Sequence, residues 1–489
     1  MDYPESKTAP WSHQITAWKL IQKHPAFYLA HEMGVGKSKI VVDACTGFNA
    51  KKILIICPKK VIGVWPKQFE IHSARNVEVI PLVKGTSVTK AALIDKKLRT
   101  SNGQPQAFII NYESCFRSPI GPTINKYKKI TKPGILLGTK WDMLVADEAH
   151  RIKSPGGRAS WQLYRLGKVN QRKLFLSGTP MPASPLDLYA QYRALNPKIF
   201  ACNFTQFRAR YAVMGGYLGK QIFEYQNIDD LNKRMFSIAH EVLADNVLDL
   251  PPRVNREVYY DLKPSTMKIY KSLEIDFIAQ WDQGEIVADN ILVKLLRLAE
   301  LSCGIATNED GRKSIIDTSK ADQIMDFLED LPQNEPVAIY CKFTPELQLI
   351  KKMLQDSGKS VAEVSGRMDE LELWQDGHRT VIVLQIDAGS EGIDLTRARY
   401  CLYSNMGLKL GVYLQSRKRI RRPGQNQKVF YYHFLGNRTI EIANFNALKD
   451  KKTIVDFFLR GIHQYKIDGI APKSKRIRGL ALSQILEGN

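Results

Sequence analysis

Short apolar runs alternate with amphipathic stretches along most of this 489-residue chain. Apolar strands separated by helices are typical of parallel sheets that are buried on both faces. The alternation therefore predicts an α/β fold of parallel sheets covered by helices. The expected strands of the first half are Phe27–Ala30, Ile53–Cys57, Val77–Val83, Ala107–Ile110, Met143–Ala146 and Lys173–Ser177, with helices that include Ser38–Thr46 and Ser184–Leu195.

A second alternating series follows in the other half of the chain. Its expected strands are Val337–Cys341, Val361–Val364, Val381–Leu384, Tyr400–Tyr403 and Val429–Phe434, and its helices include Ala321–Leu331, Glu346–Asp356 and Gly411–Arg421. The pair Pro251-Pro252 stops regular structure between the two series. We therefore expect one lobe over residues 1–250, with a largely helical insertion at about 181–249, a second lobe over 251–460 and a basic tail over 461–489.

Composition narrows the class of partner. Lys and Arg total 71 against 49 Asp and Glu, a net charge of +22, which favours nucleic acid over a merely basic soluble protein. The seven cysteines show no C-x-x-C spacing, which argues against a zinc module and for a reducing compartment. No apolar run is long enough to cross a membrane, and the polar N-terminus is no signal peptide. We expect a cytoplasmic chain, or a nuclear one in a eukaryote.

A phosphate-binding loop follows the first expected strand. Phe27–Ala30 leads into His31-Glu32-Met33-Gly34-Val35-Gly36-Lys37-Ser38, and a helix begins there. Glycines let backbone N–H groups wrap phosphates, and the helix N-terminus adds its positive end. Lys37 would reach the β- and γ-phosphates, and Ser38 would bind Mg²⁺. The general pattern places Gly where His31 stands, so the flanking strand and helix carry much of this prediction.

A second acidic motif strengthens the prediction. The apolar strand Met143–Ala146 ends in Asp147-Glu148-Ala149-His150. A carboxylate at the carboxyl end of a strand beside a phosphate loop is placed to hold Mg²⁺, which would be the role of Asp147. Glu148 would orient and deprotonate the attacking water. The two motifs together predict ATP hydrolysis.

These ordered motifs resemble the Swi/Snf-type DNA translocases of helicase superfamily two, over about residues 10–450. Trp11-Ser12-His13-Gln14 resembles the Q motif, which implies that Gln14 reads the adenine. The phosphate loop is similar to the family's Asp-Glu-Met-Gly-Leu-Gly-Lys-Thr, with His31 in place of the acid. Motif Ia is matched by Ile56-Cys57-Pro58-Lys59 and motif III by Ser177-Gly178-Thr179-Pro180.

Lobe 2 carries the remaining resemblance. Tyr340-Cys341-Lys342-Phe343 is similar to motif IV, and 388–395 to motif V, where the family usually has Asn in place of Asp394. Motif V also departs at 387–390, where the family has Arg-Ala-Gly-Gly and this chain Asp-Ala-Gly-Ser. The most specific match is motif VI, Gln415-Ser416-Arg417-Lys418-Arg419-Ile420-Arg421-Arg422-Pro423-Gly424-Gln425. It implies that Arg419 and Arg422 are arginine fingers, which stabilise charge on the γ-phosphate.

The resemblance implies two tandem RecA-like lobes, the cofactors ATP and Mg²⁺, and three sets of site residues. The catalytic set is Lys37, Asp147, Glu148, Arg419 and Arg422, with Ser38 and Asp147 as Mg²⁺ ligands. The cofactor-binding set is Gln14, Gly34, Val35, Gly36, Lys37, Ser38, Gly392, Asp394 and Gln415. The DNA-binding set is Pro58, Lys59, Lys84, Gly85, Asn111, Lys342 and Gly366. A P-loop and fingers on different lobes imply that hydrolysis requires the lobes to close, which can ratchet the motor along a strand.

Blocks of positive charge suit phosphate contacts. From Leu395 to Ile440 there are ten Lys or Arg and no Asp or Glu. From Ser114 to Trp141 there are six Lys or Arg and again no Asp or Glu. For the cluster at 125–132, a solvated loop and a DNA loop are equally compatible with the sequence. For the basic tail, we favour a DNA contact or a solvated segment over a nuclear-import signal.

Three functions are compatible with these observations. The first is a motor on double-stranded or branched DNA, and the sequence Leu186-Asp187-Leu188-Tyr189 after motif III resembles the fork-remodelling, strand-annealing branch. The second is an RNA or DNA strand-separating helicase, which shares the Asp-Glu-Ala-His box, although RNA helicases of that kind typically end motif VI in Gly-Arg. The third is a DNA-binding scaffold with an inactive ATP site, against which the intact Lys37 and Glu148 argue. A protein partner that supplies specificity fits each of them.

Overall fold

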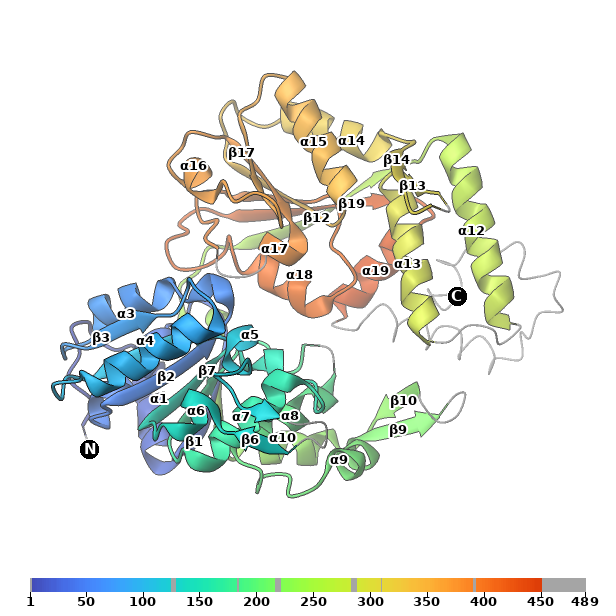
Figure 1. Ribbon diagram of the computed structural model, residues 1–489. Helices are drawn as coiled ribbons and strands as arrows, with labels where there is room; N and C mark the ends of the chain where they lie inside the picture. The colour runs from blue at the N-terminus through green and yellow to red at the C-terminus, as the bar shows by residue number, and fades with distance from the viewer. Residues whose placement is uncertain are drawn as a thin grey trace. The chain divides into compact units, whose positions relative to one another are not determined.

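The computed structural model describes residues 2–450, except 125–128, 183, 216–220, 283–287, 309 and 390–392. The chain divides into two compact units, Met1–Asp249 and Leu250–Asn489, and Figure 1 shows a strand-rich centre in each. The tail at 461–489 and Gly392 lie outside the described residues. Among the described residues, no helix has both the length and the apolar character needed to span a membrane.

The first unit is built on a seven-stranded sheet in the order β11-β1-β8-β7-β2-β4-β3. Its described strands all pair in parallel, as the alternating pattern predicts. The strands are β1 (Ala26–His31), β2 (Lys52–Cys57), β3 (Glu78–Pro81), β4 (Gln106–Asn111), β7 (Met143–Asp147), β8 (Lys173–Leu176) and β11 (Ala239–Val242). A separate hairpin joins β5 (Thr123–Ile124) to β6 (Ile130–Lys132).

Helices cover the sheet of the first unit in two groups. They are α1 (Ser12–Lys23), α2 (Lys37–Gly47), α3 (Val64–His72), α4 (Ser87–Arg99), α5 (Tyr112–Cys115), α6 (Gly134–Gly138), α7 (Arg158–Val169) and α8 (Leu188–Leu195). Helix α2 contacts α1 and α3, while α7 contacts α5, α6 and α8. Crossovers between parallel strands are right-handed. The chain moves toward one edge of the sheet from β1 to β2 to β3, which places α2 and α3 on one face. It moves back in the opposite direction from β7 to β8, which places α7 on the other face.

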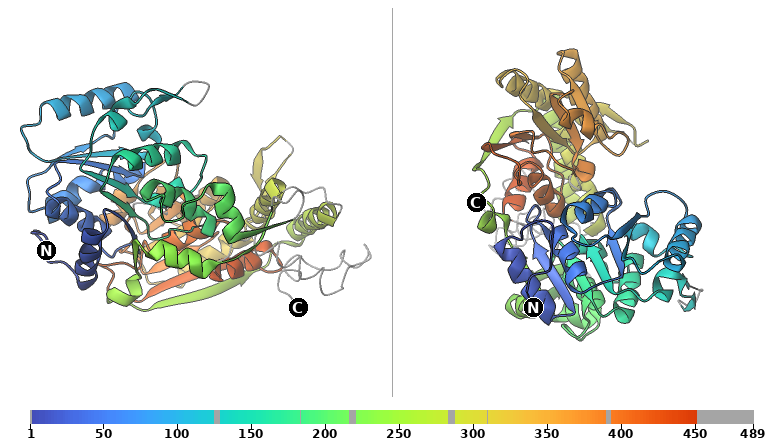
Figure 2. Two further views of the ribbon diagram at one scale, coloured as in Figure 1. Left: turned by 90° about the horizontal axis from the view of Figure 1, so that it is seen from below. Right: turned by 90° about the vertical axis from the view of Figure 1, so that its left-hand side faces the viewer.

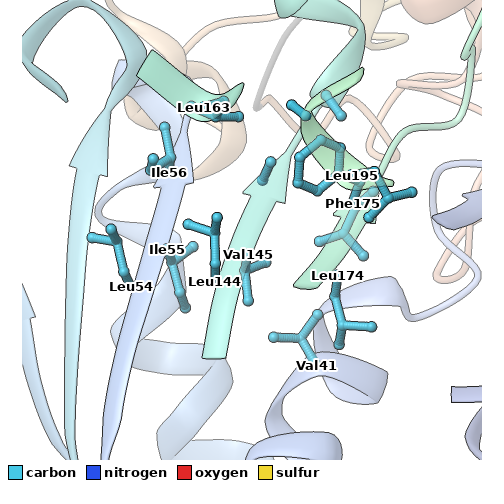
Figure 3. Packing of buried hydrophobic residues seen from close by; sticks show 14 of the residues in the cluster. Val41, Leu54, Ile55, Ile56, Leu144, Val145, Leu163, Leu174, Phe175 and Leu195 are labelled. Carbon is cyan, nitrogen blue, oxygen red and sulfur yellow. The ribbon is translucent and has the colours of Figure 1, made fainter. Parts of the chain in front are cut away.

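The core of this unit lies between the sheet and its helices. Strands β2, β7 and β8 contribute almost only fully buried residues. Figure 3 shows their apolar side chains together with Val41 of α2, Leu163 of α7 and Leu195 of α8, which belong to the same cluster. This layered packing fixes the carboxyl ends of the strands, where the motif residues begin.

The segment after β8 is more varied than the helical insertion expected from the sequence. It contains the expected helix as a short 3-10 turn, Pro185–Asp187, followed by α8, and then α9 (Phe204–Tyr211), α10 (Ile228–Phe236) and α11 (Ala244–Val247). It also contains the hairpin of β9 (Ala212–Gly215) and β10 (Gln221–Tyr225), and the strand β11. Strand β11 pairs in parallel with β1 at the edge of the main sheet, so this segment is part of the first unit's sheet.

The second unit has a six-stranded sheet in the order β12-β19-β18-β15-β17-β16, and its described strands again all pair in parallel. Its strands are β12 (Arg253–Tyr260), β15 (Val337–Cys341), β16 (Val361–Val364), β17 (Val381–Gln385), β18 (Tyr400–Tyr403) and β19 (Val429–Gly436). A hairpin of β13 (Ile305–Thr307) and β14 (Lys313–Ile315) stands apart from it. Strand β12 was not predicted, because it is an edge strand whose side chains are mostly exposed and therefore not an apolar run.

Eight helices of the second unit are described, and Figure 2 shows them from two further sides. They are α12 (Pro264–Asp282), α13 (Ala288–Ser302), α14 (Ser319–Glu329), α15 (Thr344–Asp356), α16 (Leu371–Gln375), α17 (Ile386–Gly389), α18 (Leu410–Arg417) and α19 (Ile440–Lys449). The predicted helix Gly411–Arg421 is too long at its end. The backbone leaves the helix after Arg417 because the carbonyl of Arg419 accepts a hydrogen bond from the N–H of Leu395.

A neutral histidine is built into the core of the second unit. His433 on β19 is fully buried and stacks on Tyr403, with ring centroids 5.0 Å apart. Its Nε2 lies 2.9 Å from the hydroxyl of Tyr413. Burial, and then the charge of Arg417, lower the pKa of His433 to about 3. The folded unit therefore holds His433 without a proton at pH values where an unfolded chain binds one.

This difference predicts a pH-dependent stability. As the pH falls below about 6.5, the unfolded state gains a proton at His433 while the folded state does not, so the free energy of unfolding falls. Between about pH 7 and pH 5 this loss amounts to about 2 kcal/mol. We expect this fall in the free energy of unfolding to be smaller in H433Q than in the natural chain, by the same amount. The measurement is urea unfolding followed by circular dichroism at both pH values. Equal losses in the two proteins would contradict the prediction.

Candidate functional site

The predicted motif residues of the first unit gather at one edge of its sheet. The phosphate loop follows β1, Asp147 ends β7, and Ser177 follows β8. These three strands are adjacent in the order β1-β8-β7. Because parallel strands all present their carboxyl ends at the same edge, residues far apart in sequence meet there.

The phosphate loop has the backbone that its glycines predict. Gly34 and Gly36 have φ values of +83° and +78°, a region that side chains with a Cβ rarely adopt. Gly36 is the residue before α2, so the helix N-terminus opens directly on the loop. The ammonium group of Lys37 donates to the carbonyls of His31, at 2.9 Å, and Glu32, at 2.8 Å. These bonds hold Lys37 across the loop, where a phosphate could replace the carbonyls.

The residues of the predicted Q motif pack on this loop. Gln14 accepts from the N–H of Trp11 at 2.9 Å and donates from Nε2 to the carbonyl of Gly36 at 3.4 Å. His13 donates to the carbonyl of Val35 at 2.8 Å. A Cβ on Gly36 would lie 2.3 Å from Gln14 Nε2, so a glycine is required for this close approach. The structure thus brings together the helix before β1 and the loop after it.

His31 replaces the family's acidic residue without bringing a charge. It is fully buried, and its Nε2 lies 3.0 Å from Nδ1 of His240 on β11. Burial, followed by His240 and Lys37, lowers the pKa of His31 to about 2. A neutral imidazole therefore takes the place of the carboxylate. His240 could not be found from the sequence, because its partner lies 209 residues away and no motif marks it.

Asp147 and Glu148 form a carboxylate pair in which Asp147 is buried and Glu148 is partly buried. Asp147 is 8% exposed, and its backbone carbonyl accepts from the hydroxyl of Tyr112 at 2.8 Å. Burial, and then the charge of Glu148, raise the pKa of Asp147 above its ordinary value, while Lys37 acts in the opposite direction. Glu148 has a φ of +53°, a strained conformation for a residue with a Cβ, and such strain is concentrated at functional sites.

A chain of close contacts runs from this pair to predicted motif III. Glu148 Oε2 lies 3.3 Å from Nδ1 of His150, and that nitrogen lies 2.9 Å from the hydroxyl of Ser177. Ser177 in turn accepts from the N–H of Thr179 at 3.1 Å. The chain from Glu148 to Thr179 was not predicted, because the sequence places the two motifs about thirty residues apart without marking their contact. It couples the acidic motif to the loop after β8.

Predicted motifs V and VI also meet, within the second unit. Arg422 donates from Nη1 to the carbonyl of Ile393 at 3.4 Å, and the same nitrogen lies 3.7 Å from Oδ2 of Asp394. Arg419 is 6% exposed, and Gln415 is also buried. Asp394 caps the backbone by accepting from the N–H of Thr396 at 2.9 Å. The unusual aspartate of motif V thus takes a structural role beside the predicted finger Arg422.

The predicted DNA-binding residues differ in accessibility. Lys59, Lys84, Gly85 and Gly366 are exposed, whereas Pro58 and Asn111 are buried. Asn111 donates to Glu113 at 2.7 Å, and Lys342 is ion-paired with Asp387, the departure from the family pattern in motif V. The exposed residues are available to a phosphate as they stand, and the others are not.

The known proteins that this chain resembles identify its family. The SNF2-related domain matches residues 13–305, and the helicase conserved C-terminal domain matches residues 319–424. The chain belongs to the SNF2-related family. The resemblance to Swi/Snf-type proteins is thereby confirmed, and the two parallel sheets confirm the predicted pair of α/β lobes.

Curated relatives of this SNF2-related chain include a "SWI/SNF-related matrix-associated actin-dependent regulator of chromatin subfamily A-like protein 1 homolog" of Caenorhabditis elegans, 25% identical over 89% of this chain and 59% of the relative. "DNA annealing helicase and endonuclease ZRANB3" of Bos taurus is 21% identical over 88% of this chain and 39% of the relative. The chain spans about half the length of the curated relatives it matches. A Sulfolobus solfataricus SWI2/SNF2 ATPase core, solved with double-stranded DNA, is 18% identical over 99% of this chain and 98% of that one, with a TM-score of 0.42.

The close approach at Gly36 generates a prediction. We expect G36A to lower the free energy of unfolding by about 1–2 kcal/mol, because alanine is strained at this positive φ and its Cβ displaces Gln14. Gly63 supplies a matched control, since its φ is −71° and no atom lies within 4 Å of an added Cβ. G63A should leave stability unchanged or raise it slightly in the same urea titration. Equal stabilities of the two variants would show that the loop does not depend on glycine at 36.

Proposed function

We propose that this chain is an ATP-dependent motor that translocates on double-stranded DNA and remodels DNA or protein–DNA complexes. One observation carries the proposal: the phosphate loop, the buried Asp147 and the partly buried Glu148 meet at one edge of a parallel sheet in a SNF2-related chain. That arrangement suits a nucleoside triphosphate on the loop and a carboxylate beside its terminal phosphate. ATPase rates with duplex, forked and single-stranded DNA, and with RNA, test it directly.

The residues present fit Mg²⁺. Asp147 is a buried carboxylate whose charge is disfavoured by burial and by Glu148, and a divalent cation supplies the missing opposite charge. Asp147 and Ser38 would hold the ion. When bound, Mg²⁺ neutralises charge on the β- and γ-phosphate oxygens.

Each of the chain's own residues has a defined task in this proposal. Lys37 exchanges its two carbonyl partners for phosphate oxygens, and the N–H groups around Gly34 and Gly36 bind the same phosphates. Glu148 orients the attacking water and accepts its proton. Arg419 and Arg422 stabilise charge that develops on the γ-phosphate, and Gln14 positions the adenine.

The link through His150 to Ser177 gives ATP hydrolysis a mechanical consequence. A change at Glu148 alters its 3.3 Å contact with His150, and His150 also lies 2.9 Å from Ser177. Ser177 in turn fixes the backbone of Thr179. We assign this chain of contacts the task of signalling the state of the nucleotide to the loop after β8.

The DNA track rests on basic groups at the edge of the first unit's sheet. Lys90 lies close enough to Lys59 and Arg117 for both charges to lower its pKa, after the larger effect of burial. Lys59 is exposed directly after β2. A cluster of like charges without specific base contacts suits the backbone of a duplex, which a translocase contacts independently of sequence.

Strand annealing or fork remodelling is the second candidate function. The relative from Bos taurus favours it, because that protein is a "DNA annealing helicase and endonuclease" by name. ATP-dependent annealing of complementary strands on branched DNA tests this candidate. Strand separation without annealing would favour the strand-separating alternative. ATP hydrolysis stimulated more by RNA than by duplex DNA would overturn the proposal that the chain moves along DNA.

The predicted general base allows a sharp test of hydrolysis. We expect E148Q to reduce the DNA-stimulated ATPase rate by about 10²–10⁴-fold, because an amide accepts no proton from water. Binding of a fluorescent ATP analogue should be retained, since Glu148 is not assigned a contact with the nucleotide. A control variant, E70Q on the exposed surface of α3, should keep the natural rate. Unchanged hydrolysis in E148Q would remove Glu148 from the role of general base. A natural chain that shows no DNA-stimulated hydrolysis would support the inactive-scaffold alternative.

The exposed Lys59 allows a test of the DNA track. K59Q should weaken duplex binding for all sequences alike and reduce the slope of log affinity against log salt by about 1, because one phosphate contact is lost. The measurement is fluorescence anisotropy at several salt concentrations. K19Q, which removes the same charge from an exposed position of α1, should leave the slope unchanged. The same slope in K59Q and the natural chain would remove Lys59 from the track.

A further inference from the structure

A cavity lies in the first unit, away from the phosphate loop. It has a volume of about 650 Å³, within the range of small-molecule sites. Its lining includes Phe116, directly after α5, and Arg158, Trp161, Gln162 and Arg165 of α7. Helix α7 covers the face of the sheet opposite to α2, so this cavity is separate from the site described above.

One face of α7 supplies the chemistry of the cavity. Arg158, Trp161, Gln162 and Arg165 are spaced by three, four and seven residues, which places their side chains side by side on a helix. Helix α7 contains no acidic residue. The helix therefore presents two cations, one large aromatic ring and one amide to the same cavity.

The amide of Gln162 has unmet hydrogen-bonding capacity. The side chain is fully buried, and neither its Nε2 nor its Oε1 has a hydrogen-bond partner among the described residues. A buried amide in that condition costs about 1–3 kcal/mol relative to one that is hydrogen-bonded. Because Gln162 lines the cavity, a ligand with a donor and an acceptor on one edge would satisfy both atoms.

The two arginines are available to an anion. No ion pair joins Arg158 or Arg165 to a carboxylate in the described part of the chain, and none of the residues lining the cavity is acidic. The guanidinium of Arg158 lies 4.6 Å from the centre of the Phe116 ring, a cation–π contact between two residues that line the cavity. Burial lowers the pKa of Arg165, so this cation is partly desolvated and gains from an anionic partner.

Trp161 is held in place with part of its surface open. It is 40% exposed, although it is a large apolar side chain. The guanidinium of Arg193 on α8 lies 4.3 Å from its ring centre and is itself fixed by bonds to the carbonyl of Pro155, at 2.7 Å, and the hydroxyl of Ser160, at 2.9 Å. A ring fixed in this way is prepared for stacking, because little rotational freedom remains to be lost.

We propose that this cavity binds one unpaired nucleotide of a single DNA strand. The base stacks on Trp161, its hydrogen-bonding edge meets the amide of Gln162, and the adjoining phosphates bind Arg158 and Arg165. An aromatic surface, an amide and unpaired cations together match a nucleotide more fully than they match an apolar peptide. The site would give a motor on duplex DNA a means to recognise an unpaired strand at a junction.

Binding to short single strands, measured without ATP, tests the proposal independently of the proposed motor. The probes are a fluorescent oligothymidylate and an abasic strand with the same number of phosphates. We expect W161A to bind the oligothymidylate about 5- to 100-fold more weakly than the natural chain, while its affinity for the abasic strand is unchanged. W161F should retain most of the difference between the probes, because phenylalanine also stacks.

The arginines are tested with the same two strands. R165Q should weaken binding of both probes, and R99Q, which removes an exposed arginine of α4, should weaken neither. Equal affinity of W161A and the natural chain for oligothymidylate would overturn the proposal. An equal loss on both probes in W161A and W161F would also overturn it, since the effect would then lie in folding. Free thymidine monophosphate that competes as well as the strand would overturn the assignment to a strand.

Discussion

Asp147 ends a strand of which every residue is buried, and its carboxylate is therefore held where its charge is disfavoured. The neighbouring Glu148 increases this penalty, and Lys37 reduces it. Lys37 follows β1, Ser177 follows β8, and Asp147 ends β7 with Glu148 directly after it, and these three strands are adjacent in the sheet. All three must present their carboxyl ends at one edge to bring these groups together, which a parallel sheet does and an antiparallel one does not. The parallel direction of these strands thus explains why the phosphate loop lies beside the acidic motif.

The strands of the main sheets were largely predictable, because strands buried on both faces are continuous apolar runs. Val337–Cys341, Val361–Val364 and Tyr400–Tyr403 have the predicted bounds, and β1, β2 and β7 differ by a residue or two. The phosphate loop was predictable for a similar reason: its glycines are required by local backbone geometry. Features that a short segment determines by itself can be found in that segment.

The features that could not be predicted depend on distant partners. Strand β12 is polar because it lies at an edge, and β11 is identified only by its pairing with β1. Helix α18 ends early because of a bond between Leu395 and Arg419. The neutral state of His31 requires His240, and the contact of His150 with Ser177 requires the packing of two neighbouring strands. Nothing in the local sequence records these pairings.

The position of β1 has a consequence for folding during translation. This strand is synthesised long before its two neighbours, β8 and β11, which lie at 173–176 and 239–242. Until β8 has been synthesised, β1 has unsatisfied backbone groups along both sides, and one side stays unpaired until β11 follows. Such strands are prone to pair with other chains. The loop that would bind ATP is therefore completed late, and nascent chains that stop before residue 242 carry its sequence without its supports. The interval between the synthesis of β1 and that of β11 is the stage at which this unit most needs protection from aggregation.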